Sequence, residues 1–356
     1  MRVSLFRAFP DAFRKSMQIY ADQLLNGIRP LLQEHEEIVD CLPTKIHLKP
    51  KVARYWDQYV RYQRFSKTSA GDVNHVIDHG YGHLLLSLPA HNTVVTFHDS
   101  MVTKVKGVAF STRLSLRYSL TAIRKAAMVI ADSWTSREDF LNLVDYPEEK
   151  VKVVYLGIDP SFHMVQDRDA LKRRYQLPGK YILHIGHTLN YTNLERVFLA
   201  LGCLVRQYGV DVQLIKVGDP FSAGQERLLD KLDLRTRVLH LGKVPFRDLP
   251  TIYNCADVLL YPVLYAGFGW PPLEAMACGT PVVSSNRGSL PEILGDAAIL
   301  TDPEDHQQMA AHVAALLTDG TLREAYRVKG FQQAQRYRWD KTAREVLAIY
   351  RQIANA

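Results

Sequence analysis

The chain carries its most decisive stretch near the end, reading Tyr265-Ala266-Gly267-Phe268-Gly269-Trp270-Pro271-Pro272-Leu273-Glu274-Ala275-Met276-Ala277-Cys278-Gly279-Thr280-Pro281-Val282-Val283. Prolines are tolerated in the first helical turn, so Pro271 and Pro272 predict a helix start with Glu274 in its first turn. Gly279 predicts the end of that helix, and residues 280–285 then favour a short buried strand. The stretch is therefore expected to form a glycine loop, a helix and a strand.

This loop and helix suit a particular kind of ligand. Gly267 and Gly269 lack side chains where a ligand could approach the backbone closely. The N–H groups and dipole of the helix start favour a phosphate, and the Glu274 carboxylate beside them could accept sugar hydroxyls. A nucleotide-diphosphate sugar has these needs. The alternative is a plain loop-to-helix turn with a favourably placed acid.

Strand-like and helix-like segments alternate along the whole chain, which favours parallel sheets covered by helices. We expect strands at 72–79, 92–99, 127–133, 152–158, 180–186, 212–218, 238–242, 258–262 and 281–283. Residues 159–179 are expected to be the linker. The fold class predicted is α/β, with two doubly wound parallel-sheet domains facing each other across a cleft. The first is expected to span 1–165, with a C-terminal helix at 340–356 packing back on it, and the second 166–339.

Length and composition agree with this division. A chain of 356 residues is too long for one ordinary core, and 47% hydrophobic with 23% charged residues is typical of a globular protein. The four cysteines lack metal-ligand or disulfide spacing, residues 1–7 lack the apolar run of a signal peptide, and no stretch has the length of a membrane span. We therefore expect a cytoplasmic protein.

The net charge of +7 comes with a concentration of basic residues in the first half of the chain. These residues are Lys45, Lys49, Lys51, Arg54, Arg61, Arg64, Lys67, Lys104, Lys106, Arg113, Arg117, Arg124 and Lys125. One interpretation is a basic face for an anionic membrane or a phosphate-bearing acceptor, and the other is a set of solvated helix faces. Nucleic acid is not an expected partner, because no zinc-finger spacing, RNA-binding aromatic signature or basic heptad pattern occurs.

A histidine run in the first half raises the question of a metal. His75, His79 and His83 are spaced by four residues, with Asp78 among them. Gly80 and Gly82 interrupt any helix that would align these side chains, so a strand end and loop is favoured and no metal site is expected.

Several strings together resemble GT-B glycosyltransferases of the large retaining family 4, the glycosyl transferases group 1. The resemblance covers most of the chain, is strongest from 238 to 298 and is weak in the first third. It is carried by Leu241-Gly242-Lys243-Val244, Tyr253-Asn254-Cys255-Ala256-Asp257-Val258, the 267–279 stretch, Ser289-Leu290-Pro291-Glu292-Ile293-Leu294-Gly295-Asp296-Ala297-Ala298, Thr96-Phe97-His98-Asp99, Ala131-Asp132-Ser133 and Arg338-Trp339-Asp340-Lys341-Thr342-Ala343.

The resemblance implies roles for particular residues. Glu274 corresponds to the second glutamate of the family's E-x7-E motif, which holds the donor ribose. The backbone of Gly267, Phe268 and Gly269 would face the donor sugar, and His98 would reach a donor-sugar hydroxyl from the first domain. The further donor-binding residues expected are Gly186 at the end of a strand, Val244 beside the nucleobase, and Trp270 and Leu273 at the helix start that would hold the diphosphate.

The sequence departs from the family pattern in three places. The first glutamate of E-x7-E is replaced by Ala266. The basic pair that usually follows the first glycine of the second domain is replaced by Tyr191 and Thr192. A glycine pair expected near the start is replaced by Phe13-Arg14-Lys15-Ser16-Met17. Arg14, Lys15 or Lys243 are candidates to supply the missing positive charge.

The resemblance implies a metal-independent, cofactor-free, retaining hexosyltransferase. Its donor would be a nucleotide-diphosphate sugar, and its acceptor a glycan, a lipid-linked sugar or a small glycoside. The basic first half favours a place at the inner membrane face. The alternative hypothesis is a catalytically silent GT-B protein that binds nucleotide or glycan as a partner subunit. The donor nucleotide and sugar, the acceptor, the linkage and the oligomeric state do not follow from the sequence.

Overall fold

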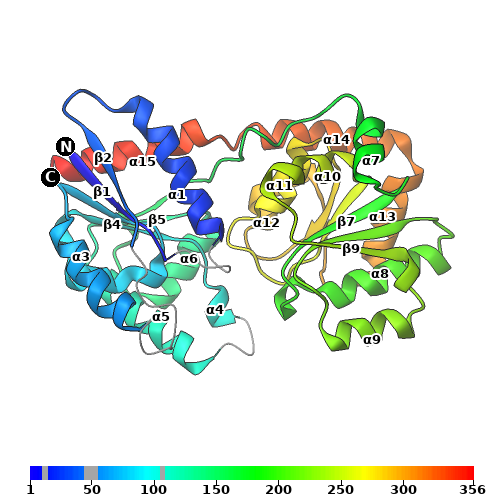
Figure 1. Cartoon of the computed structure of the whole chain (residues 1–356), viewed down its shortest axis with the longest axis horizontal. Helices are drawn as coiled ribbons and strands as arrows, with labels where there is room; N and C mark the ends of the chain where they lie inside the picture. The colour runs from blue at the N-terminus through cyan, green and yellow to red at the C-terminus, as the bar shows by residue number, and fades with distance from the viewer. Residues whose placement is uncertain (10–14, 44–54, 105–108) are drawn as a thin grey trace. The chain divides into compact units, whose positions relative to one another are not determined.

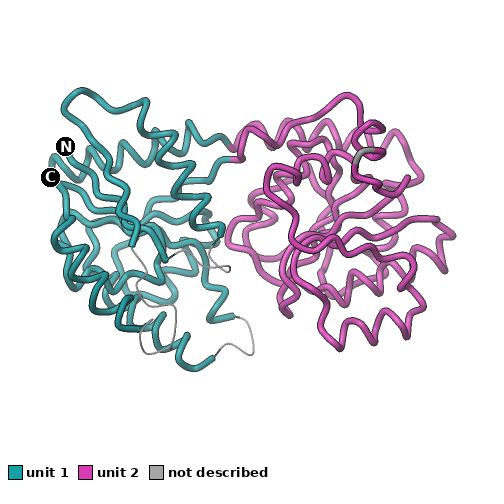
Figure 2. Tube along the Cα trace, in the orientation of Figure 1, with its two compact units in different colours: residues 1–157, 338–356 teal, residues 158–337 magenta. Residues whose placement is uncertain are grey.

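The computed structural model describes residues 1–9, 15–43, 55–104 and 109–356. It divides the chain into two compact units, Met1–Gly157 with Arg338–Ala356, and Ile158–Tyr337 (Figure 2). The domain boundaries expected from the sequence, after residues 165 and 339, lie a few positions farther along the chain than the boundaries of these two units. Arg14, Lys45, Lys49, Lys51, Arg54 and Lys106, named above for their charge, lie outside the described residues, as does Phe13.

The first unit is built on a parallel sheet with the strand order β2-β1-β3-β4-β5-β6 (Figure 1). The inner strands are buried along their whole length, which is why they read as continuous apolar or β-branched runs rather than as alternating ones. The strands are β1 (Arg2–Phe6), β2 (Glu37–Cys41), β3 (Val73–Val76), β4 (Thr93–Phe97), β5 (Met128–Ala131) and β6 (Val151–Val153).

Helices of the first unit include the last helix of the chain. The α-helices described are α1 (Lys15–Ile28), α3 (Tyr62–Thr68), α4 (Met101–Lys104), α5 (Phe110–Ile123), α6 (Trp134–Leu143) and α15 (Trp339–Ala354). Helix α15 buries residues at helical spacing, among them Ala343, Val346 and Tyr350. It packs closely on α1, since a Cβ added to Gly27 would come within 2.8 Å of the Ala343 Cβ.

The second unit has a parallel sheet with the order β12-β11-β10-β7-β8-β9. From the first strand, β7, the chain adds β8 and β9 on one side and then β10, β11 and β12 on the other. The strands are β7 (Tyr181–Gly186), β8 (Gln213–Gly218), β9 (Val238–Gly242), β10 (Val258–Tyr261), β11 (Val282–Ser285) and β12 (Ile299–Thr301). The sheet therefore reverses its strand order between β7 and β10, at what is called a topological switch point.

Helices and the main core of the second unit pack on this sheet. The α-helices are α7 (Arg168–Tyr175), α8 (Leu194–Arg206), α9 (Ala223–Lys231), α10 (Leu249–Cys255), α11 (Trp270–Ala277), α12 (Leu290–Leu294), α13 (His306–Thr318) and α14 (Gly320–Ala334). Apolar side chains of α8 and α13 join those of the strands in one core, for example Phe198, Leu260 and Val313.

The predicted α/β class with two parallel sheets is confirmed, but the sequence analysis missed three strands and took one helix for part of the linker. The short strand β1, the partly exposed edge strand β2 and the three-residue strand β12 gave no strong pattern. The expected linker at 159–179 contains α7, whose first turn is capped by the Asp167 side chain through a 2.8 Å hydrogen bond from the Ala170 N–H.

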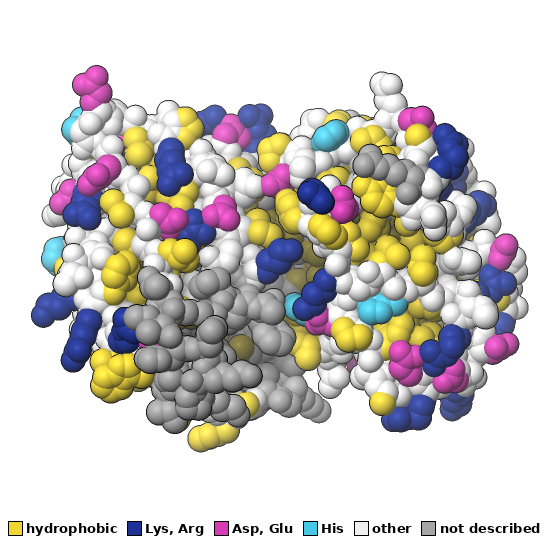
Figure 3. Space-filling model, viewed as in Figure 1, with side chains coloured by type: hydrophobic (Ala, Val, Ile, Leu, Met, Phe, Trp, Pro, Cys, Tyr) yellow, Lys and Arg dark blue, Asp and Glu magenta, His cyan; other side chains and the backbone are white. Residues whose placement is uncertain are grey.

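The surface carries both signs of charge. On the face that Figure 3 shows, Lys and Arg side chains are interspersed with Asp and Glu side chains on both units. Within the described residues, no helix combines the length and the apolar character that crossing a membrane requires.

Candidate functional site

The switch point of the second unit brings the decisive stretch to the carboxyl ends of two neighbouring strands. Strand β7 ends at Gly186, and β10 leads into the loop that carries Gly267 and Gly269. The loops after these strands are joined by a 2.7 Å hydrogen bond from the Leu264 N–H to the Tyr191 carbonyl. Open α/β sheets bind ligands at such a switch point, so this edge is the candidate site.

The glycine loop is held in one conformation by its surroundings. Gly269 has a φ of +109°, and a Cβ there would lie 2.7 Å from the Leu290 Cδ2, so a larger residue would be strained and crowded. The Ser289 hydroxyl donates to the carbonyls of Ala266 at 3.0 Å and Phe268 at 2.8 Å. The loop therefore presents a fixed backbone at the carboxyl edge of the sheet.

The expected position of Glu274 in the first turn of the helix is wrong. Gly269 is the N-cap of α11, which begins at Trp270, so Glu274 falls in the second turn. Pro271 and Pro272 occupy the first turn instead, and proline has no N–H to donate. The start of α11 is consequently poorer in backbone donors than an ordinary helix start, which limits what it can offer to a diphosphate.

Glu274 itself has an unusual electrostatic setting. The hydroxyl of the fully buried Tyr253, on α10, donates to the Glu274 Oε2 at 2.8 Å. Tyr253 is the hydrogen-bond partner of this carboxylate in the described part of the chain, which leaves Oε1 available to a ligand. Burial raises the pKa of Glu274 to about 7 despite the opposing effect of the Tyr253 hydrogen bond. The group therefore titrates near neutral pH, as perturbed groups at functional sites often do.

A histidine, a lysine and a carboxylate gather at the ends of β7, β8 and β9. The Asp219 carboxylate lies 2.7 Å from the His187 Nδ1 and 3.3 Å from the Lys243 Nζ. The His187 contact lowers the pKa of Asp219, and burial opposes this effect. The Lys243 side chain is 66% exposed, so its ammonium can reach a ligand while it stays near Asp219. We refer to His187, Asp219 and Lys243 as the edge cluster.

A buried lysine fixes the end of β7 beside the edge cluster. The Lys216 Nζ donates to the Gly186 carbonyl at 2.6 Å and to the Val217 carbonyl at 2.8 Å. Burial lowers the pKa of Lys216 to about 8. Gly218 has a φ of +119°, and a Cβ there would lie 2.1 Å from the Gly186 carbonyl oxygen. Only glycine fits at this approach of β8 to β7.

The other residues predicted to bind the donor lie around the same edge, with different degrees of access. Gly186, Gly267 and Gly269 follow β7 and β10, Val244 follows β9, and Val244 and Trp270 are both partly exposed. The side chains of Phe268 and Leu273 are buried, at 6% and 0% exposure, so these two residues can offer a ligand only their backbone. Their roles in binding stay predictions.

His98 lies in the first unit, directly after β4, and its imidazole is fully engaged there. Its Nδ1 is 2.6 Å from the Asp132 Oδ2, and its Nε2 is 2.7 Å from the Ile77 carbonyl oxygen. Both partners are acceptors, so both nitrogens must carry a proton. Burial alone would lower the pKa of His98, but the Asp132 carboxylate outweighs burial and raises it to about 9. The predicted contact with a donor hydroxyl stays a prediction, and it requires Nε2 to leave the Ile77 carbonyl.

The histidines considered for a metal site have structural partners. The His75 Nδ1 is 2.6 Å from the Tyr350 hydroxyl and its Nε2 is 2.7 Å from the Thr96 hydroxyl. Burial lowers the pKa of His75 to about 3, so it is neutral at ordinary pH. Among residues 1–9, 15–43, 55–104 and 109–356, no three His, Cys, Asp or Glu side chains are placed to hold a metal together.

Sequence reasoning missed Tyr253, Asp219 and His187 as parts of the site. Asp219 and His187 each directly follow a glycine at the end of a predicted strand, and polar residues gather at such ends, so this signal was present. Tyr253 belongs to a string already matched to the family, but its contact with Glu274 joins two helices and leaves no local trace.

Comparisons with known proteins agree with this geometry. A profile described as "Glycosyl transferases group 1" matches residues 167–333, and one described as "Glycosyltransferase Family 4" matches residues 26–162. O-antigen chain mannosyltransferase B of Escherichia coli is 30% identical over 269 residues, which cover 72% of this chain and 70% of that protein. The serotype-specific mannosyltransferase WbdA of Escherichia coli is 25% identical over 292 residues, 77% of this chain but 36% of that larger protein.

A solved structure supports the fold. Anabaena HepE, solved in complex with UDP and glucose, superposes with a TM-score of 0.76 over 98% of both chains at 18% identity.

Proposed function

The chain belongs to the glycosyl transferases group 1, and from that premise we propose that it transfers a hexose from a nucleotide-diphosphate sugar with retention of anomeric configuration. Membership of this family confirms the predicted GT-B fold and the predicted glycosyltransferase activity, and it leaves the donor, the acceptor and the stereochemistry as proposals. The observation that carries the donor proposal is the switch point of the second unit, with the glycine loop after β10, Glu274 on the helix that follows this loop, and the edge cluster at the ends of β7, β8 and β9.

The nucleoside part of the donor is assigned to Glu274 and Val244. A carboxylate accepts two hydroxyl hydrogen bonds readily, and the Glu274 Oε1 is available for the ribose while Oε2 is held by Tyr253. Ribose hydroxyls that donate to this carboxylate favour its ionised form, so donor binding should lower the pKa of Glu274 from about 7. Complexes of HepE with UDP and with UDP-glucose support a nucleotide donor of this kind.

The diphosphate is assigned to the edge cluster together with the glycine-loop backbone. Because α11 has prolines in its first turn, its N-terminus supplies few donors to a phosphate. Lys243 can supply positive charge and His187 a ring nitrogen at the neighbouring strand ends, in place of the usual basic pair that is Tyr191 and Thr192 here. Charge-assisted hydrogen bonds of this kind contribute about 1.5–3 kcal/mol each.

The same groups would act in the chemical step. Negative charge develops on the leaving diphosphate as the bond to the sugar breaks, and fixed donors aimed at it stabilise the transition state. Ala266 itself has no carboxylate to offer in place of the first glutamate, and its carbonyl is held by the Ser289 hydroxyl. We therefore assign stabilisation of the transferring sugar to backbone groups of 267–269, with His98 as the predicted contact from the first unit.

Donor turnover is the direct test of this proposal. Purified protein is offered UDP-, GDP- and ADP-hexoses, and nucleotide release and sugar transfer are measured with and without EDTA. We expect turnover with one nucleotide class, unchanged by EDTA, and donor affinity at least tenfold weaker in Glu274→Ala. Glu324→Ala, which removes an exposed carboxylate elsewhere in the same unit, should bind donor like the wild type. Absence of turnover with every donor would refute the transferase proposal, and unchanged affinity in Glu274→Ala would refute the ribose assignment.

The diphosphate assignment has its own test. Lys243→Gln should weaken binding of the nucleoside diphosphate about tenfold and leave binding of the free nucleoside unchanged, because the nucleoside carries no phosphate. Lys231→Gln removes an exposed lysine from α9 and should change neither affinity. An equal loss of affinity for the nucleoside and for the nucleoside diphosphate would show that Lys243 does not contact the phosphates.

For the acceptor, we propose a glycan or lipid-linked sugar at the membrane surface. The mannosyltransferase relatives and the basic first half support this class. Binding to anionic vesicles, measured by flotation at 0.05 and 0.5 M salt, should weaken with salt if the basic face contributes.

A further inference from the structure

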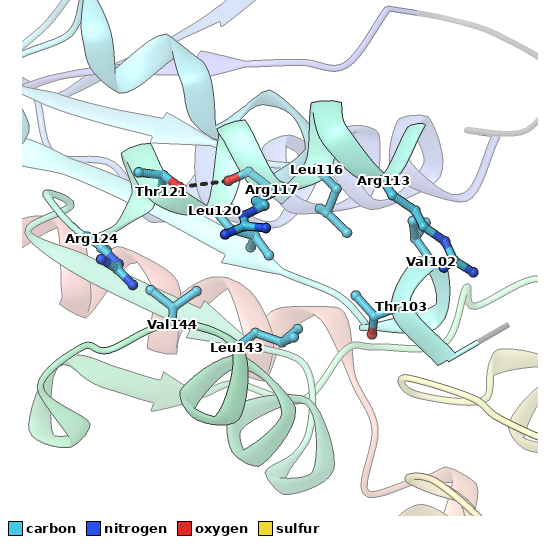
Figure 4. A pocket seen from close by; sticks show the side chains of 10 residues that line it. All are labelled: Val102, Thr103, Arg113, Leu116, Arg117, Leu120, Thr121, Arg124, Leu143 and Val144. Atoms are coloured by element: carbon cyan, nitrogen blue, oxygen red, sulfur yellow. Dashed lines mark hydrogen bonds between the residues drawn. The ribbon is translucent and has the colours of Figure 1, made fainter. Parts of the chain in front are cut away.

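A groove in the first unit is lined by residues that take no part in the proposed donor site. It runs between α5 and the end of α6, with α4 at one end, and has a volume of about 550 Å³. Figure 4 shows α5 along one side, Leu143 and Val144 along the other, and Thr103 with Val102 at the Arg113 end. The lining residues are Val102, Thr103, Arg113, Leu116, Arg117, Leu120, Thr121, Arg124, Leu143 and Val144.

The lining combines an apolar floor with a positively charged rim. The α5 residues in the lining recur at helical spacing, so they form one face of that helix. Leu116 and Leu120 form the floor and are each 7% exposed, whereas the arginines are exposed. None of the ten lining residues is acidic, and Arg117 and Arg124 form no ion pair among the described residues.

A second apolar line lies beyond the arginines on the same helix. Phe110, Leu114 and Tyr118 follow each other at intervals of four residues and are 80%, 56% and 47% exposed. Large apolar side chains in such a row usually mark a binding surface. The arginines of α5 are therefore bordered by apolar surface on both sides.

We propose that this groove binds an anionic amphiphile, with its apolar chain against Leu116 and Leu120 and its phosphate paired with Arg117 and Arg124. An apolar ligand alone would gain nothing from the positive charges of Arg117 and Arg124, and a phosphate alone would gain nothing from the leucine floor. Guanidinium groups match phosphate geometry through bidentate hydrogen bonds, and they tolerate an apolar setting better than ammonium groups. A phosphate on a single hydrocarbon chain satisfies both parts of the lining.

The groove also has a place in the proposed reaction. Helix α4 follows His98, Asp99 and Ser100, so the end of the groove lined by Val102 and Thr103 lies near the carboxyl end of β4. A lipid phosphate held there would direct an attached sugar toward the edge of the sheet that carries His98. Use of this amphiphile as the acceptor rests on the proposed transferase function, whereas its binding to the groove does not.

Direct binding to the full chain without nucleotide tests the groove. The probe is monododecyl phosphate below its critical micelle concentration, with inorganic phosphate and dodecyl maltoside as comparison ligands, measured by calorimetry. We expect monododecyl phosphate to bind at least tenfold more tightly than either comparison ligand. Arg117→Gln with Arg124→Gln should reduce this affinity at least tenfold. Thr121→Trp, which fills the groove without changing charge, should do the same.

The matched control is Arg227→Gln with Lys231→Gln, which removes two exposed charges from α9 in the second unit and should bind like the wild type. Unchanged thermal melting would show that the variants are folded. Wild-type protein that binds no monododecyl phosphate, or groove variants that bind it normally, would overturn the proposal.

Anionic vesicles separate the groove from a bilayer-docking surface. Loss of binding to phosphatidylglycerol vesicles in the serine variants of Phe110 and Leu114 would show that the protein docks on a bilayer through these residues. If, in addition, Thr121→Trp changes binding neither to vesicles nor to monododecyl phosphate, the groove proposal is wrong. Failure of donor turnover would instead refute the transferase proposal and leave amphiphile binding intact, so the two failures are distinguishable.

Discussion

Glutamate 274 should make the stability of the protein depend on pH in a specific direction. Its pKa is raised by burial from the usual 4.5 to about 7 in the folded state. The folded protein therefore favours the protonated carboxyl more than the unfolded chain does. The stabilisation that results is fully present below pH 4.5 and is lost as pH rises through 7.

The magnitude follows from the two pKa values. Integrating proton binding with an unfolded pKa of 4.5 and a folded pKa of about 7 yields a loss of about 2–3 kcal/mol in unfolding free energy between pH 5 and pH 8. Glu274→Gln replaces the titrating group by a neutral amide whose oxygen can still accept the Tyr253 hydrogen bond. The variant should therefore lack this contribution to the pH dependence.

The assay is urea unfolding of both proteins at pH 5.0 and pH 8.0, followed by tryptophan fluorescence. Other titrating groups, His98 and Lys216 among them, are common to both proteins and cancel in the difference. We expect the wild type to lose about 2–3 kcal/mol more than Glu274→Gln over this range. Glu324→Gln, which alters an exposed acid whose pKa is lowered by Arg327, should follow the wild type. Equal pH dependence in the wild type and Glu274→Gln would refute the raised pKa and the burial argument behind it.

Two further substitutions test the supports of the site. Gly218→Ala should destabilise the second unit by about 1–3 kcal/mol and weaken donor binding, because its Cβ would meet the Gly186 carbonyl at 2.1 Å. The control is Gly202→Ala inside α8, where the nearest neighbouring atom lies 3.8 Å from the new Cβ. This variant should melt at the same temperature as the wild type or at a higher one. Equal losses of melting temperature in Gly218→Ala and Gly202→Ala would contradict this reasoning. Asp132→Asn should lower the pKa of His98 from about 9, since burial would then be opposed only by the weaker effects of Asp78 and the Ile77 carbonyl, as followed by NMR titration of the imidazole. A His98 pKa that stayed near 9 would show that a group other than Asp132 stabilises the protonated imidazole.

Most of the second unit could be predicted because its signals are local. A continuous apolar run of β-branched residues predicts a buried strand, and glycine and proline mark where the neighbouring helix starts and ends. These signals located β7 to β11 and the loop and helix around Gly269. The same signals did not reveal β2, because this strand lies at a sheet edge and most of its side chains are exposed or partly exposed. They also misplaced the start of α11. In α11 the N-cap is Gly269 and the helix begins at Trp270, one residue before the prolines. Glu274 therefore lies in the second turn.

The candidate site divides in the same way between local and distant information. Glu274, Gly267 and Gly269 were found because they stand close together in a string that resembles a known family. The groups that determine their chemistry were not found, since Tyr253 lies 21 positions from Glu274 and Asp132 lies 34 positions from His98. Pairs this far apart are brought together by strand order and helix packing, which a single sequence does not specify.

The sequence by itself thus determined the α/β class, the two parallel sheets and the stretch that forms the carboxyl edge of the second one, because hydrophobic period and turn residues act over a few neighbouring positions. Only the tertiary structure decided that Glu274 titrates near neutral pH, that His187 and Lys243 share Asp219, and that α5 lines a groove with an arginine rim. Burial and charge proximity set these properties, and both depend on which distant segments the fold places side by side.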